Sequence, residues 1–259
     1  MFRKRRPPID APQPPRGYRA YAVGDVHGRL DLLNQLLARV EQDAERQPAR
    51  KSLLIFLGDL IDRGPDSRGV VERLRTYAPN RLQLHFLAGN HEEVLLRLLA
   101  GERGILASWL KFGGAECLRS YGTDPASLAG LNERQALQIV MQTIPADHAR
   151  FIGTFADTLT LGDYLFVHAG IRPGLDLSLQ SQTDLRWIRS SFLDCEEDHG
   201  MLVVHGHTIS ETVDERSNRI GIDTGAYRTG VLTALAVEGD RRWFLDTDIT
   251  EAKQAAWMQ

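Results

Sequence analysis

The segment Leu53–Gly64 constrains the fold of this chain more than any other stretch. It consists of an apolar run, Leu53–Leu57, followed by Gly58-Asp59-Leu60-Ile61-Asp62-Arg63-Gly64. A short apolar run bounded by glycine is typical of a buried strand, and the flanking glycines are typical of tight turns. Asp59 is therefore predicted just beyond a strand end, where its carboxylate can face a shared crevice. A single Gly-Asp pair after a strand is most often only a turn, so the pattern becomes informative through its repetition.

Four more strand-like runs end in polar groups of the same kind. In chain order, the groups after these runs are Gly24-Asp25-Val26-His27-Gly28, Gly89-Asn90-His91-Glu92, His168-Ala169-Gly170 and His205-Gly206-His207-Thr208. The first two, like the central segment, lie between a strand pattern and an amphipathic helix pattern, which is the repeating unit of α/β proteins. The repetition of five such groups with complementary chemistry predicts one common site at the strand ends.

The rest of the chain predicts a single mixed α/β (α+β) domain over residues 18–259. Pairs of short apolar runs flank Gly162-Asp163 and Gly239-Asp240, which are turn signals of β-hairpins. Between residues 101 and 155 apolar residues recur at helical spacing without any ligand-like cluster. We interpret this segment either as a helical insertion over the site or as additional core helices. The tail from Thr250 predicts a short helix.

Composition argues against several classes of function. The net charge is −3 with 25% charged residues, so no global field points to nucleic acid. No apolar run approaches the length of a membrane span. Cys117 and Cys195 match neither a metal-site spacing nor a disulfide framework, and the N-terminus lacks the apolar core of a secretory signal. A cytoplasmic location without integral membrane association is therefore expected.

Residues 1–17 are predicted to form a disordered, basic and proline-rich arm. The four basic residues at positions 3–6 and the prolines that follow favour neither a packed core nor regular pairing. The alternative interpretation is a tether to an acidic membrane surface or to an acidic partner.

Six side chains at the predicted strand ends are candidate metal ligands: Asp25, His27, Asp59, Asn90, His168 and His207. Carboxylate, imidazole and amide ligands without thiolate suit cations such as Mn²⁺, Fe²⁺ or Zn²⁺. Six protein ligands exceed what one catalytic metal needs when water positions stay open. They suit two cations, about 3.5–4 Å apart, that clamp a phosphoryl group between them. Asp59, in the central segment, is the natural bridge between the two.

Hydrolysis of a phosphate ester also needs cationic groups for the phosphate oxygens and a proton donor for the leaving oxygen. Arg63 and Arg189 are the candidate guanidinium groups. Arg189 is expected on the polar face of a helix, where a surface salt bridge is its alternative role. His91 directly follows Asn90, and Asp62 can orient it and keep it charged, so His91 and Asp62 are the candidate acid pair.

Three of these motifs resemble the signature motifs of the PPP-type serine/threonine protein phosphatases, which belong to the calcineurin-like metallophosphoesterases. They are Gly24–Gly28, Gly58–Gly64 and Gly89–Glu92, and the later His168-Ala169-Gly170 and Gly206-His207-Thr208 are similar to the family's two later metal histidines. The resemblance spans roughly residues 20–247. It implies a central two-sheet β-sandwich flanked by helices, with a two-metal centre at the strand ends.

The resemblance also implies a role for each site residue. The first metal would be held by Asp25, His27 and Asp59, and the second by Asp59, Asn90, His168 and His207. His91 with Asp62 would be the acid pair, and Arg63 and Asn90 would bind the substrate phosphate. Trp187-Ile188-Arg189 resembles the Trp-x-Arg segment of the bacterial and phage-lambda branch, which implies Arg189 as the second phosphate arginine, although Arg186 lies one turn away.

Two positions bear on the branch of the family. Asp223-Thr224-Gly225-Ala226-Tyr227 stands where eukaryotic members carry Ser-Ala-Pro-Asn-Tyr, which points to the bacterial branch and leaves the role of Tyr227 open. His27 stands where a related branch that cleaves dinucleoside tetraphosphates symmetrically typically carries glutamine. The histidine favours the monoester phosphatase branch without excluding nucleotide substrates.

The sequence therefore predicts a metal-dependent phosphatase acting on phosphoserine and phosphothreonine in a protein or peptide partner. A metal-activated hydroxide would attack phosphorus in line, without a phosphoenzyme. Two divalent ions are expected, with Mn²⁺ ahead of iron or zinc. The alternatives are a dinucleoside polyphosphate (diadenosine tetraphosphate) hydrolase or broad phosphoesterase on the same centre, and a non-enzymatic module. The expected mark of such a module, a missing ligand or arginine, is not found.

Overall fold

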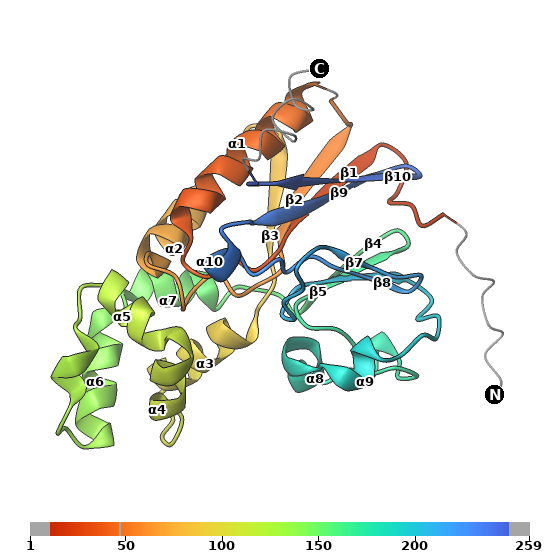
Figure 1. The fold of residues 1–259 in the computed structure, drawn as a ribbon. Helices are drawn as coiled ribbons and strands as arrows, with labels where there is room; N and C mark the ends of the chain where they lie inside the picture. Colours follow the sequence, from red (N-terminus) through yellow and green to blue (C-terminus); the bar gives the residue numbers. More distant parts are fainter. Residues whose placement is uncertain (1–10, 47, 249–259) are drawn as a thin grey trace.

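The computed structural model describes residues 11–46 and 48–248, and these residues form two packed β-sheets with helices on both outer sides (Figure 1). The first sheet, in the order β10-β9-β1-β2-β3, contains β1 (Tyr18–Val23), β2 (Lys51–Phe56), β3 (Leu82–Phe86), β9 (Thr233–Glu238) and β10 (Arg241–Asp246). The second sheet, in the order β4-β5-β6-β8-β7, contains β4 (Thr158–Leu161), β5 (Tyr164–Val167), β6 (Leu202–His205), β7 (Asp214–Glu215) and β8 (Arg219–Gly221). The predicted mixed α/β two-sheet sandwich is confirmed.

The direction of the strands brings the polar loops together. In the first sheet β1, β2 and β3 are parallel, and in the second sheet β5, β6 and β8 are parallel. Parallel strands have their carboxyl ends at the same edge of a sheet, which is where α/β proteins place their sites. The loops also bond to one another: the amides of Val26 and His27 donate to the carbonyl of Asp59 at 3.1 and 2.9 Å.

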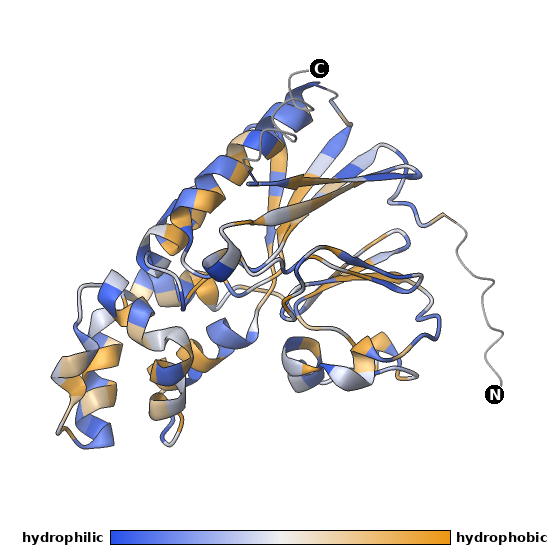
Figure 2. Cartoon of the chain, in the orientation of Figure 1, coloured by the Kyte–Doolittle hydropathy of each residue, from blue (hydrophilic) through white to orange (hydrophobic). Residues whose placement is uncertain are grey.

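Alternating side chains of the first sheet build two apolar layers. Ala20 and Ala22 of β1 face the layer between the sheets, where they share a buried cluster with Phe166. The alternate residues Tyr21 and Val23 belong to the cluster under the helices, as the two-residue period of a strand requires. Figure 2 shows the matching apolar stripe on the helix that follows β1. Each leucine buried in these layers contributes about 2 kcal/mol to the free energy of unfolding.

Helices cover the outer faces of both sheets. On the first sheet lie α1 (Leu30–Arg46) and α2 (Ser67–Arg75), whereas α3 (Asn90–Leu99) lies below the sheet, against the helical segment that follows it. On the second lie α8 (Gln182–Trp187) and α9 (Ser190–Leu193), whose Leu185 and Phe192 pack with Val203. Single turns at Pro125–Leu128 and Leu177–Leu179 and the short α10 (Ala226–Thr229) complete the connections. Among the described residues, no helix combines the length and the apolar character that crossing a bilayer requires.

The segment between β3 and β4 is helical, as its periodicity predicted. It comprises α4 (Leu106–Trp109), a π-helical turn (Leu110–Gly114), α5 (Ala115–Ser120), α6 (Glu133–Thr143) and α7 (Ala146–Ile152). Its buried residues, including Leu118 and Val140, share one apolar cluster with Leu95 of α3. The segment therefore extends the core under the first sheet, and α4 at the same time reaches the polar loops.

The two ends of the chain fall partly outside the described residues. Residues 1–10 of the predicted arm, with its basic cluster, and the helix expected from Thr250 lie outside them. The last part of the arm lies against the turn between β4 and β5. There the amide of Gln13 donates to Oδ2 of Asp163, and the amide of Asp163 donates to the carbonyl of Gln13, both at 3.0 Å.

Candidate active site and metal centre

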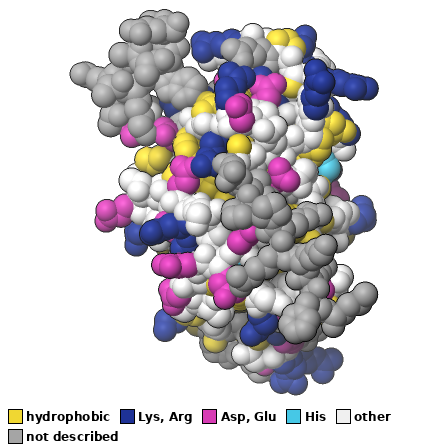
Figure 3. Space-filling model, turned by 90° about the vertical axis from the view of Figure 1, so that its right-hand side faces the viewer, with side chains coloured by type: hydrophobic (Ala, Val, Ile, Leu, Met, Phe, Trp, Pro, Cys, Tyr) yellow, Lys and Arg dark blue, Asp and Glu magenta, His cyan; other side chains and the backbone are white. Residues whose placement is uncertain are grey.

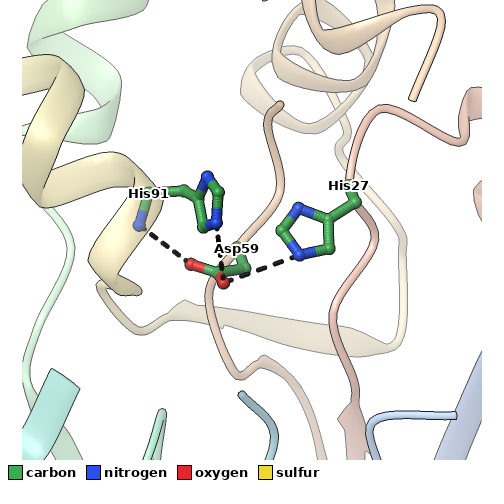
Figure 4. Close-up of side chains that lie close together, drawn as sticks. All are labelled: His27, Asp59 and His91. Atoms are coloured by element: carbon green, nitrogen blue, oxygen red, sulfur yellow. Dashed lines mark hydrogen bonds and ion pairs between the residues drawn. The ribbon is translucent and has the colours of Figure 1, made fainter. Parts of the chain in front are cut away.

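Asp59 lies at the centre of the polar loops, directly after β2. His27, from the loop after β1, and His91, from the first turn of α3, both point their rings at its carboxylate (Figure 4). The distances from Asp59 Oδ2 are 3.6 Å to His27 Nε2 and 3.9 Å to His91 Nε2. The amide of His91 also donates to Asp59 Oδ1 at 3.0 Å. All three side chains are buried, and together they form one compact group of possible metal ligands.

The other oxygen of Asp59 faces a second group. Its Oδ1 lies 3.5 Å from Nε2 of His168. The same Nε2 lies 3.0 Å from Oδ1 of Asn90 and 3.2 Å from Nδ1 of His207. The ligand atoms of Asp59, His168 and His207 all lie within 4.8 Å of one another. The carboxylate predicted to bridge two cations thus stands between two ligand groups.

Asp25 joins this arrangement through the backbone of His207. The amide of His207 donates to both oxygens of the buried Asp25 carboxylate at 3.1 Å. Burial raises the pKa of Asp25 well above its usual value, and the charges of Asp223 and Asp59 add to the effect. Asp223, to which the sequence analysis assigned no role, is therefore a further buried acidic residue beside Asp25. A cation between these carboxylates would relieve their repulsion.

The tautomers of two histidines fit a metal site. Nδ1 of His27 lies 2.8 Å from the carbonyl of Ile61, and Nδ1 of His168 lies 2.8 Å from the carbonyl of Leu57. A carbonyl only accepts, so Nδ1 carries the proton and the lone pair of each Nε2 faces Asp59. Burial lowers the pKa of His27 to about 3 and also lowers that of His168, which keeps both rings neutral.

The lone pair of His168 Nε2 also faces Asn90 Oδ1, an acceptor that supplies no proton. Nε2 of His207 is buried without a hydrogen-bond partner. Unpaired acceptors are unfavourable in a buried site, and a divalent cation can satisfy them. The donor set of carboxylate, imidazole and amide fits a first-row divalent cation.

Backbone strain is concentrated in the same loops. Five non-glycine residues of the described chain have positive φ: His27 (44°), Asp59 (50°), Asp62 (70°), Arg63 (67°) and His207 (63°). All five are residues that the sequence predicted for the site. The left-handed region costs such residues about 1 kcal/mol each. The glycines were expected to make the turns, but three candidate ligands (His27, Asp59 and His207) also adopt the strained conformation.

Glu92 is a buried residue of the site that the sequence analysis missed. Its Oε2 accepts from the amides of Asp59 (2.8 Å) and Gly89 (2.9 Å), and its Oε1 accepts from the amide of Leu60 (2.7 Å). The carboxylate thus ties the loop after β2 to the start of α3. Burial and the charge of Asp59 raise the pKa of Glu92 to about 7. Its position directly after His91 was the signal that could have revealed it.

The predicted acid pair forms a direct contact. Nδ1 of His91 lies 2.7 Å from Oδ2 of the fully buried Asp62. Burial lowers the pKa of His91, but the charges of Asp59 and Asp62 outweigh it and raise the pKa to about 9. Nη2 of Arg63 lies 3.1 Å from His91 Nε2. A guanidinium only donates, so Nε2 of His91 accepts in this contact, and it carries a proton only once Arg63 turns away from it.

Tyr227 lies against the site. The guanidinium carbon of Arg63 sits 5.0 Å from the centre of the Tyr227 ring, and the rings of Tyr227 and His27 are nearly perpendicular at a centroid distance of 5.4 Å. Tyr227 therefore orients Arg63 through a cation–π contact.

The prediction that Arg189 lies on a helix face is wrong. The helix α8 ends at Trp187, and Arg189 precedes α9 with φ −133° and ψ −107°. Its Nη1 donates to Oγ1 of Thr208 at 3.2 Å, beside the predicted ligand His207. Arg186, the alternative candidate, is instead engaged by Asp157, with Nη2 2.6 Å from Oδ1. Arg189 is thus the arginine of this segment that adjoins the site.

Comparison with known proteins identifies the family. Residues 18–230 match the calcineurin-like phosphoesterase family. The chain is 28% identical over 226 residues to serine/threonine-protein phosphatase 1 of Salmonella typhimurium, covering 84% of this chain and 91% of that protein. It is 26% identical over 233 residues to bis(5′-nucleosyl)-tetraphosphatase PrpE (asymmetrical) of Halalkalibacterium halodurans, covering 82% and 87%.

A solved structure shares the fold. A provisionally assigned diadenosine tetraphosphatase superimposes with a TM-score of 0.61 at 21% identity, covering 93% of this chain and all of that one. Because the family match spans most of the chain and the relatives include a bacterial serine/threonine phosphatase, the protein is a member of the calcineurin-like phosphoesterase family, consistent with its PPP-type branch.

Proposed function

We propose that this protein is a metal-dependent phosphatase that hydrolyses phosphoserine and phosphothreonine monoesters in proteins. Family membership supports phosphoester hydrolysis in general. The observation that carries the finer proposal is the buried His91–Asp62 pair with Arg63 at its open end, next to the ligand groups around Asp59. A seryl or threonyl oxygen is a poor leaving group, and it needs such a proton donor.

Each side chain then has a defined task. Asp25, His27, Asp59, Asn90, His168 and His207 would hold two divalent cations, which when bound supply charge stabilisation and an activated water for in-line attack. Arg63 and Arg189 would bind the equatorial phosphate oxygens, assisted by the amide of Asn90. His91 would give the proton on Nε2 to the leaving oxygen while Asp62 holds the ring. Mn²⁺ remains our prediction for the metal, with iron and zinc as alternatives.

Hydrolysis of dinucleoside polyphosphates is the second candidate function. It is favoured by the similarity to the bis(5′-nucleosyl)-tetraphosphatase of H. halodurans, which extends over 82% of this chain. A nucleoside phosphate leaves more easily than an alkoxide, so this reaction would depend less on His91.

We propose a phosphorylated protein or peptide as the partner, rather than nucleic acid. The net charge of −3 gives the chain no global field that would attract nucleic acid. On the face drawn in Figure 3, basic and acidic side chains of the described residues are mixed. A cytoplasmic location remains a prediction from the sequence.

A substrate panel tests both functions. Turnover of a phosphoserine peptide, p-nitrophenyl phosphate and diadenosine tetraphosphate is compared with added Mn²⁺, with and without chelator. We expect chelator-sensitive turnover of the first two. Activity confined to the dinucleotide would refute the phosphatase proposal, and a lack of turnover across the panel would support a non-enzymatic module.

A further inference from the structure

Trp109, at the end of α4, contacts the acid pair from the helical segment. Its indole N–H donates to Oδ2 of Asp62 at 2.9 Å. The same oxygen is the partner of His91 Nδ1, at 2.7 Å. The other oxygen, Asp62 Oδ1, is buried without a hydrogen-bond partner. Both side-chain donors therefore converge on one oxygen, and the helical segment supplies one of them.

The backbone after Trp109 is shaped for this contact. In the π-helical turn, the carbonyl of Gly113 accepts from the amide of Arg63 at 3.1 Å. Gly113 has φ +117°, and a Cβ there would lie 2.5 Å from the amide nitrogen of Arg63. A Cβ on Gly114 would lie 2.2 Å from Cδ2 of the Trp109 ring. Two glycines thus let the turn close over the indole and the Asp62–Arg63 backbone, and π-helical turns are frequent at functional sites.

A second side chain of the segment borders the same carboxylate. Cys117, on α5, is fully buried, and its burial together with the charge of Asp62 raises the pKa of the thiol well above its usual value. The thiol is therefore protonated and adds no charge. The indole N–H remains the strong donor that this segment offers to Asp62.

We propose that Trp109 is a positioning residue for leaving-group protonation: its indole N–H holds the Asp62 oxygen that orients His91. The inference rests on the proposed function, because it assigns Trp109 a share in proton transfer to the leaving oxygen. A carboxylate that loses one of two donors can rotate about its side chain and carry the imidazole with it. Small misplacements of a reacting group are costly to rate.

The test compares Trp109→Phe with Trp243→Phe, which makes the same chemical change on β10, where the indole lies beside Arg19 at 5.5 Å. For each variant, kcat and KM are measured with phenyl phosphates of graded leaving-group quality and with a phosphoserine peptide. Metal content and melting temperature are measured in parallel. A packing role alone would lower the melting temperature without making kcat depend on the leaving group.

We expect Trp109→Phe to lower kcat about 10- to 100-fold for the poorest leaving groups, the usual range for a lost partner of a site residue. For p-nitrophenyl phosphate, which needs little protonation, the loss should stay below about threefold. KM and metal content should not change, and Trp243→Phe should match the wild type. An equal loss for all leaving groups, or no loss, overturns the proposal.

A second variant guards against misfolding. Site-specific incorporation of benzothienylalanine at position 109 keeps the ring shape and replaces the N–H by sulfur. It should reproduce the leaving-group dependence, and wild-type kcat with poor leaving groups would contradict the proposal. In metal-free ¹⁵N-labelled protein, Asp62→Asn should shift the indole resonance of Trp109 but not that of Trp243. An unmoved Trp109 resonance would likewise contradict it.

The phenyl phosphate series separates this inference from the proposed function. Wild-type protein that ignores the phosphoserine peptide, yet shows a leaving-group dependence that steepens in Trp109→Phe, refutes the protein phosphatase proposal and leaves the role of Trp109 standing. Wild-type protein without turnover of any phosphate ester overturns both.

Discussion

Three histidines of the site converge on the carboxylate of Asp59. His27 and His91 face one of its oxygens and His168 faces the other, while its amide is held by Glu92. Burial opposes its charge, whereas positive charge on the surrounding histidines, when they are protonated, lowers its pKa.

His91→Asn tests the acid role. The variant keeps the amide that donates to Asp59 Oδ1 but removes the proton donor, so kcat for a phosphoserine peptide should fall about 10²- to 10⁴-fold. Bound metal, measured by elemental analysis of the purified protein, should remain at the wild-type level. Full kcat in this variant would show that another group protonates the leaving oxygen.

Glu92→Gln tests whether the Glu92 carboxylate holds the loop after β2 against the start of α3. The NH₂ group of glutamine cannot accept, so at least one of the backbone amides that donate to Glu92 would lose its acceptor. The free energy of unfolding should therefore fall by about 1–3 kcal/mol. Urea denaturation measures the change. Glu116→Gln, which breaks an exposed pair with Arg119, is the matched control and should cost less than about 1 kcal/mol. Equal effects would show that Glu92 is an ordinary ion-pairing residue.

For single residues, the sequence analysis predicted those that belong to a local motif and missed those whose partner is distant in the sequence. His27, Asp59 and His168 stand at strand ends beside glycine, a local pattern that can be read directly. Trp109 and Asp62 are 47 residues apart. No local period distinguishes an indole that packs in a core from one whose N–H meets a carboxylate.

The site residues lie at the ends of helices and strands rather than in their interiors. Asn90 and His91 belong to the first turn of α3, whose orphan amides are partly satisfied by Glu92. The helix α6, farther from the site, begins at a complete capping box: Asn132 Oδ1 accepts from the amide of Gln135, and Gln135 Oε1 accepts from the amide of Asn132, both at 3.1 Å. This signal explains why α6 begins where it does.

Asn132→Ala removes one of these two bonds at an exposed position. The free energy of unfolding should fall by about 1 kcal/mol, measured by thermal or urea denaturation, whereas kcat should not change. Asn132→Asp keeps the acceptor and should retain the wild-type stability. A loss of activity in Asn132→Ala would instead couple α6 to the site.

The break between α8 and α9 shows why one element was predicted wrongly. Leu185, Ile188 and Phe192 are buried together at spacings of three and four residues, which a continuous helix would also satisfy. The backbone instead extends at Ile188, with ψ 143°, and Arg189 turns to Thr208. Apolar periodicity alone cannot reveal a break that preserves it.

In the molecule as a whole, loops at the strand ends of both sheets form one polar site. The β-loop-α units of the first half and the hairpins of the second were predictable from short-range patterns. The order β10-β9-β1 was not, because it pairs the first strand with segments more than 200 residues away, such as Arg19 with Glu238. The sandwich itself was implied by resemblance to a family and not by periodicity.

Metal removal should weaken the whole fold, because the ligands come from both sheets. A ligand at 100 times its dissociation constant stabilises the folded state by about 2.7 kcal/mol. Chelator should therefore lower the melting temperature of the wild type, measured by calorimetry, and added Mn²⁺ should restore it. Asp59→Asn, which lacks the bridging charge, should show little response. A wild-type melting temperature indifferent to chelator and metal would contradict a shared metal centre.

The left-handed backbone of Asp59 and four neighbouring residues of the site has an evolutionary consequence. Glycine would relax each of these positions, so a population selected for heat resistance alone would drift toward glycine there and lose its chemistry. Thermal stability and catalytic activity therefore place opposite demands on these five positions. Variants that are more heat-stable and still active should carry their substitutions in the helices and hairpins far from the site.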